Sequence, residues 1–208
     1  MLATVEESSL PELVRGHREL YPLLADDLEP LAPAVFFAPQ GDKWSPAEHV
    51  DHLVRSVRPM TAVLRWPRPV LRVLFGKTGG SRPTEELVDR YLGRLASGAG
   101  ARGRYLPATA EAEASADGQR RLLRRCRRLG DEVGDALAGW REGDLDRYRL
   151  PHPLLGRLSV REMVAWALYH GRHHHRRILE RLEPGGGEAA PAGPLAAGEP
   201  SAAAKRSA

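Results

Sequence analysis

The chain lacks features on which several protein classes depend. It has one cysteine, Cys126, among 208 residues, which excludes an internal disulfide framework. It has no run of the roughly 20 apolar residues that a membrane-spanning helix requires. Its first residues include no apolar segment typical of a signal peptide. We therefore expect a cytoplasmic protein without a membrane-spanning segment.

A large excess of one charge is also absent. The chain has 31 Lys and Arg residues against 27 Asp and Glu residues, a formal net charge of +4. Nucleic-acid binding would require basic side chains clustered on one face together with a docking element, so nucleic acid is not an expected partner. We interpret the densest basic segment as a solvated helix face; binding of an anionic ligand, a partner or nucleic acid is the alternative. It comprises Arg120, Arg121, Arg124, Arg125, Arg127 and Arg128.

Alternating strand patterns are scarce, whereas apolar residues recur at helical spacing in four segments. These segments are residues 10–31, 45–64, 118–141 and 159–182. Three of them begin with a serine that is followed three residues later by a glutamate, the pattern of a capping box. The serines are Ser9, Ser45 and Ser159.

Four amphipathic helices predict an all-α fold, a four-helix bundle over residues 1–183. The connection between the second and third helices, residues 76–117, is rich in Gly, Pro and Ala and has a short helical pattern near 84–95. A connection of this length indicates a bundle with a crossover. Residues 184–208 are almost all Ala, Gly, Pro and Ser with a few charges, a composition that predicts a disordered tail.

Histidines are the residues whose spacing points to chemistry. His170 and His174 are four residues apart in the fourth helix, which places two imidazoles on one helix face. Neutral imidazole binds Zn, Ni, Fe and Cu, so the pair predicts half of a transition-metal site. Hydrogen-bonded histidines at the edge of the core are the alternative. A helical wheel directs both side chains toward the core and His173 to solvent, with His175 near the core on the other side.

The second helix offers a third ligand. Catalytic zinc sites commonly use three protein ligands and leave one position for water or substrate. His49 and His52 both lie on this helix, and its aliphatic stripe slightly favours His49. His17, on the apolar face of the first helix, is interpreted as a core histidine satisfied by hydrogen bonds. Cys126 lies on the apolar stripe of the third helix, where we expect a buried, inert thiol.

Three motifs resemble those of the DinB-like family. Residues 44–53, Trp-Ser-Pro-Ala-Glu-His-Val-Asp-His-Leu, resemble its second-helix motif, in which a Trp-Ser helix start is followed eight residues after the Trp by a ligand histidine. Residues 152–159 resemble the segment that opens its last helix, and residues 170–174 resemble its pair of ligand histidines. The motifs occur in the family's order and span about 44–182.

The resemblance implies a four-helix bundle that holds a divalent metal ion through three histidines. His52 matches the second-helix ligand, and His170 and His174 match the last-helix pair. On this basis His52 takes precedence over His49, which stands where the family more usually has an aliphatic residue. His152 matches the last-helix segment but is not a family ligand, and we interpret it as part of the loop structure.

Known activities of the family include S-transferases and isomerases that use low-molecular-weight thiols, and many members have no assigned reaction. The resemblance thus implies a metal-dependent enzyme with a small-molecule substrate, thiol S-transfer being the preferred reaction. A metal-dependent hydrolase, and a non-catalytic metal-stabilised bundle or stress-related binding module, are the alternatives. Zinc or nickel is favoured over iron or manganese. No catalytic residue is identified, because the role expected of Glu48 is helix capping, and a homodimer is compatible with the sequence without being specified by it.

Overall fold

The computed structural model describes residues 9–41, 43–108 and 114–183, so the tail predicted for residues 184–208 lies outside the described residues. The elements are α1 (Leu10–Leu28), α2 (Pro33–Phe37), α3 (Pro46–Leu64), α4 (Arg68–Phe75), α5 (Thr84–Ala96), the 3₁₀ helix η1 (Gly103–Tyr105), α6 (Ala116–Leu137), α7 (Glu142–Leu145), β1 (Arg149–His152), β2 (Gly156–Ser159) and α8 (Val160–Leu182). None of the described helices is both long and apolar enough to cross a membrane.

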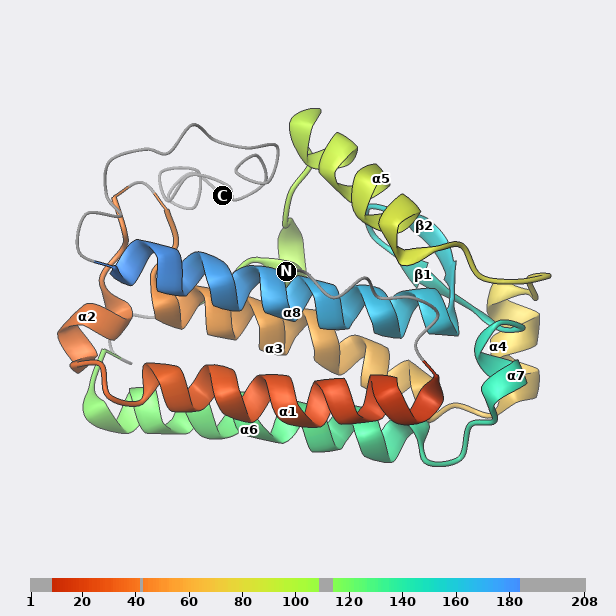
Figure 1. Ribbon diagram of the computed structural model, residues 1–208, viewed down its shortest axis with the longest axis horizontal. Helices are drawn as coiled ribbons and strands as arrows, with labels where there is room; N and C mark the ends of the chain where they lie inside the picture. Colours follow the sequence, from red (N-terminus) through yellow and green to blue (C-terminus); the bar gives the residue numbers. More distant parts are fainter. Residues whose placement is uncertain (1–8, 42, 109–113, 184–208) are drawn as a thin grey trace.

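The four long helices form a bundle (Figure 1). Helix α1 packs against α6 and α8, and α3 packs against the same two neighbours. The prediction of an all-α four-helix bundle is confirmed, and the ends of the predicted helices differ from the observed ones by a few residues. The long connection between α3 and α6 contains α5, where a short helix was expected, and α5 lies over α8 on the side away from α1 and α6 (Figure 1).

Capping boxes fix the starts of α3 and α8. In α3 the backbone N–H of Glu48 donates to Oγ of Ser45 at 3.2 Å, and the N–H of Ser45 donates to Oε2 of Glu48 at 2.8 Å. In α8 the N–H of Glu162 donates to Oγ of Ser159 at 3.0 Å, and the N–H of Ser159 donates to Oε2 of Glu162 at 2.7 Å. These bonds satisfy N–H groups that have no partner inside the helix, so they help to set where each helix begins.

The bundle also contains one two-stranded sheet, which the sequence analysis did not predict. Strands β1 and β2 pair as an antiparallel hairpin, with Leu150 opposite Leu158 and both side chains buried. Each strand has only four residues, and the two sequences, Arg-Leu-Pro-His and Gly-Arg-Leu-Ser, include a proline and a glycine, which weaken a strand signal. Gly156 begins β2 with a φ of +78°, a left-handed conformation that glycine adopts without strain. The hairpin leads directly into the start of α8.

Cys126 and the arginine-rich segment behave as expected. The thiol is buried in α6, and burial raises its pKa to about 12, which leaves it protonated and unreactive. None of the six arginines between residues 120 and 128 is buried, so they form a solvated face. Arg127 within this face pairs with Asp26 at 2.8 Å and with Glu29 at 2.7 Å.

His17 joins α1 to α8. Its ring is fully buried, and its Nε2–H donates to the carbonyl oxygen of Val164 at 3.1 Å. The interpretation as a core histidine is confirmed. Burial is the main cause that lowers the pKa of His17 to about 4.

This pKa predicts a loss of stability in acid. An unfolded histidine has a pKa near 6.5, so the unfolded chain binds more protons than the folded chain between pH 6.5 and pH 4. The stability that depends on neutral His17 is present above pH 6.5 and is lost as the pH falls through 4, to a total of roughly 3 kcal/mol. The variant His17→Gln keeps a donor for Val164 and removes the titration. Urea unfolding of chelated protein should give a flatter pH profile for this variant; parallel profiles would contradict the assignment.

Helices α1 and α6 approach closely at Gly130. A Cβ atom added there would lie 2.5 Å from the backbone oxygen of His17 and 2.8 Å from Cα of Arg18. Backbone atoms cannot move aside as a flexible side chain can, so we expect Gly130→Ala to destabilise the bundle by about 1–3 kcal/mol. On the exposed side of α5 a Cβ at Gly93 meets nothing within 4 Å, and Gly93→Ala should stabilise by roughly 0.5–1 kcal/mol. Urea denaturation measures the free energy of unfolding of both variants. A change of the same sign in the two variants would contradict the close approach of α1 and α6 at Gly130.

Candidate metal centre

Three histidines from two helices converge on one point. His52 lies on α3, and His170 and His174 lie one turn apart on α8. Nε2 of His170 is 3.3 Å from Nε2 of His52 and 3.0 Å from Nε2 of His174. All three side chains are buried, and one ring nitrogen of each lies within 4.8 Å of the others. The structure thus brings together the three residues that the resemblance pointed to, in an arrangement that could hold a metal ion.

The orientation of His52 is fixed by a backbone carbonyl. Its Nδ1 lies 2.7 Å from the oxygen of Tyr105 in η1. A carbonyl oxygen can only accept, so Nδ1 of His52 carries the proton and donates. Nε2, which faces the other two rings, therefore presents a lone pair. Metal-binding histidines commonly donate their second ring N–H in this way.

His49 lies beside the triad rather than in it. Its Nδ1 is 2.7 Å from Nδ1 of His174, so this contact orients His174 from behind. The helical-wheel preference for His49 over His52 is wrong, because the wheel was measured from the aliphatic stripe. The cluster lies off that stripe, where α3 faces both α8 and the segment around Tyr105.

His173 does not point to solvent, as the helical wheel predicted. Its side chain is buried, stacks on Tyr169 with ring centroids 6.3 Å apart and lies beside the ring of His174. His173 lines the same cavity as the triad, together with Leu95 of α5 and with Tyr105, and these neighbours are not represented in a helical wheel of α8 alone. Burial lowers the pKa of His173 to about 4.

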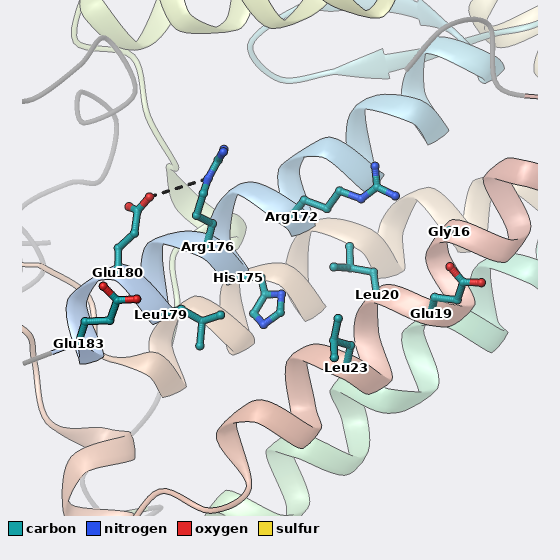
Figure 2. Close-up of a pocket in the computed structure, with 10 residues that line it drawn as sticks. All are labelled: Gly16, Glu19, Leu20, Leu23, Arg172, His175, Arg176, Leu179, Glu180 and Glu183. Carbon is teal, nitrogen blue, oxygen red and sulfur yellow. Dashed lines mark ion pairs between the residues drawn. The ribbon is translucent and has the colours of Figure 1, made fainter. Parts of the chain in front are cut away.

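His175 and His152 are outside the triad. His175 contacts Asp27 of α1 at 2.7 Å and lines a separate hollow between α1 and α8, where Arg176 pairs with Glu180 (Figure 2). His152 lies in β1, and its Nδ1 accepts hydrogen bonds from the N–H groups of Leu154 at 3.2 Å and Leu155 at 3.0 Å. This contact organises the turn of the hairpin, which agrees with the structural role expected of His152.

Burial keeps the imidazoles in the form that binds metals. It is the largest cause that holds the pKa values of His170 and His174 well below 6.5, and the neighbouring histidines add to the effect. Neutral imidazole is the ligand form. Trp166 stacks on His170 with ring centroids 4.5 Å apart, and Trp44 lies 5.0 Å from His52. These indoles pack aromatic surface against the triad.

The triad borders a cavity. The three histidines form part of the wall of a cavity of about 640 Å³, together with Trp44 and Trp166. Within the described parts of the chain, no carboxylate, thiol or fourth histidine joins the cluster. A bound ion would therefore have three protein ligands and a free position facing the cavity, the arrangement of catalytic rather than structural zinc sites.

The family model of the DinB superfamily matches residues 14–178, a range that contains all three histidines. The chain belongs to the DinB superfamily. The resemblance that the three motifs indicated is thereby confirmed. No curated protein and no solved structure was found to match this DinB-superfamily chain.

Two contributors to the site were not foreseen. Trp166 precedes His170 by four residues, so helical spacing alone could have placed its ring against the imidazole. The carbonyl of Tyr105 gives no such signal, because a backbone acceptor is available at every residue and the contact depends on how the connection folds.

The geometry predicts a graded loss of metal. His174→Ala removes a converging nitrogen, so the variant should not retain a stoichiometric ion through dialysis. His49→Leu keeps the three converging nitrogens and removes the contact behind His174, together with the contact of His49 with Arg181, and should weaken affinity by about 10- to 100-fold. His173→Ala should retain the ion, since His173 is outside the cluster. Elemental analysis, with circular dichroism as the check on folding, tests the order; equal losses from His173→Ala and His174→Ala would contradict it.

Proposed function

We propose that this protein is a divalent-metal-dependent enzyme that acts on a small molecule, with thiol S-transfer as the preferred reaction. His52, His170 and His174 would hold the ion. The observation that carries the proposal is the convergence of three imidazole nitrogens at the wall of a cavity.

The spacing of the nitrogens fits a tetrahedral ion. Zinc binds imidazole nitrogen at about 2.0–2.1 Å, so two ligands at a tetrahedral angle lie about 3.3 Å apart. The two measured separations between ring nitrogens, 3.3 Å and 3.0 Å, are close to this value. The lone pair of His52 is already directed at the common point, since its other nitrogen donates to Tyr105. Three neutral imidazoles suit zinc or nickel.

The residues around the triad would prepare the site for chemistry. A bound divalent ion supplies Lewis acidity, which lowers the pKa of a thiol or water that it coordinates. Trp44 and Trp166 exclude solvent from the buried end of the cavity. Oγ of Ser56, 3.5 Å from Nε2 of His52, offers a hydroxyl beside the position where a substrate would bind.

The absence of a carboxylate favours a thiol over water as the nucleophile. No Asp or Glu lines the cavity in the described parts of the chain, so no carboxylate base is positioned to remove a proton from water. A thiol has a pKa of about 8–9, against 15.7 for bulk water. Thiol activation therefore needs less help from the protein. This supports S-transfer over the alternative of a metal-dependent hydrolase.

Cobalt(II) provides a direct test. The chelated protein would be loaded with cobalt(II) and titrated with 2-mercaptoethanol, and the visible and near-ultraviolet spectrum should change as sulfur reaches the ion. The zinc- or nickel-loaded protein should then accelerate conjugation of the thiol to 1-chloro-2,4-dinitrobenzene. In His174→Ala the rate should fall by more than the roughly 10- to 100-fold expected for loss of a supporting contact.

Two results would contradict the proposal in different ways. Failure of the protein to retain any divalent ion would contradict the proposed metal site. Stoichiometric metal without a thiol-dependent spectral change or turnover would indicate the alternative of a non-catalytic, metal-stabilised bundle.

A further inference from the structure

We propose that the ligand of the cavity is an apolar molecule with a terminal anionic group, a carboxylate or phosphate, that Arg102 and Arg104 bind at the cavity mouth. That the other end of the ligand reacts at the histidine triad rests on the proposed function. Binding of the anionic group depends on the arginines alone.

The charge of the cavity has one sign. Among the residues that line it, Arg102 and Arg104 are the ones with a permanent charge, and no Asp or Glu is present in the described lining. A cleft lined by one sign of charge attracts ligands of the opposite sign. The guanidinium group of arginine matches carboxylate and phosphate through paired hydrogen bonds.

Neither arginine is committed to another partner within the described residues. Many arginines of this chain form ion pairs; Arg55 pairs with Asp51 at 2.6 Å, for example. Arg102 and Arg104 form no ion pair with a described residue, and both are exposed. An arginine without an internal carboxylate keeps its hydrogen-bonding capacity for a ligand.

The cavity has a buried end and an exposed end. His170, His174 and Trp166 are buried, whereas Arg102 and Arg104 are exposed. An anion bound by the arginines therefore leaves the rest of the molecule to extend inward toward the triad.

The arginines are tied to the metal centre by the chain itself. Arg104 directly precedes Tyr105, whose carbonyl accepts the hydrogen bond from His52 at 2.7 Å. Three residues later, the N–H of Ala108 donates to Oδ2 of Asp51 in α3 at 2.9 Å. These two contacts hold the segment against α3, so the distance between the arginines and the triad is constrained.

Much of the cavity wall is apolar. Val57, Met60 and Val63 of α3 face the cavity together with Leu95 of α5 and Met163 of α8. Methionine adapts to ligands of different shape. A cavity of about 640 Å³ lies within the range of small-molecule sites. The chemistry of the site thus selects one anionic end and an uncharged, apolar body.

Titration calorimetry with decanoate and decanol tests the inference, because the two probes differ in charge and share the apolar chain. Decanoate should bind more tightly than decanol, to the zinc-loaded and to the chelated protein alike. The double variant Arg102→Gln/Arg104→Gln should weaken decanoate binding by about 10-fold or more and leave decanol binding unchanged. Arg121→Gln/Arg124→Gln, which removes the same charge from the exposed face of α6, should bind decanoate as the unaltered protein does.

Three results would overturn the inference. Equal affinity for decanoate and decanol would mean that the cavity binds the apolar chain and does not recognise the carboxylate. Loss of decanoate binding on chelation, without an effect of the double variant, would make the carboxylate a metal ligand. No measurable decanoate binding would exclude this ligand class. Metal content measured on the same samples separates the two proposals: arginine-dependent binding in a protein that retains no metal supports this inference and contradicts the metal-dependent enzyme.

Discussion

The hydrogen bond from His52 to the carbonyl of Tyr105 is the contact on which the site depends. It fixes the tautomer of His52 and directs a lone pair toward His170 and His174. It also holds the connection between α3 and α6 against α3, and that connection contributes one wall of the cavity. Without this contact the bundle would keep two histidines on α8, but the third ring and the cavity wall would lose their common anchor.

The site combines two demands that oppose each other. The imidazoles have to be dry enough to stay neutral, and burial lowers the pKa values of His170 and His174 for this reason. A substrate nevertheless has to reach them. The structure meets both demands with the same residues: Trp44 and Trp166 cover part of the triad with aromatic surface, and both rings also line the cavity through which a substrate would reach the triad. Burial of polar rings is unfavourable unless they find partners, and a bound cation would provide one.

The parts of the site that were predictable from the sequence are local. The spacing of His170 and His174 and the capping boxes lie within single helices, so helical period and turn chemistry describe them. The burial of His173 depends on residues outside α8, which a wheel of one helix omits. The choice of His52 came from the resemblance, because the aliphatic stripe marks the core of the bundle and the cluster lies beside it. The contact with Tyr105 depends on the path of a long connection, for which periodicity carries no information.

His49 affects the metal centre through its hydrogen bond with His174. If His174 ligates an ion through Nε2, its Nδ1 carries the proton and donates to Nδ1 of His49. A neutral His49 then carries its own proton on Nε2, which lies 3.4 Å from Nη1 of Arg181. Two donors cannot share a hydrogen bond, so this arrangement requires the guanidinium to turn away from Nε2. An aliphatic residue in place of His49 would impose no such condition. The histidine therefore links the metal-binding tautomer of His174 to the position of a charged side chain near the end of α8.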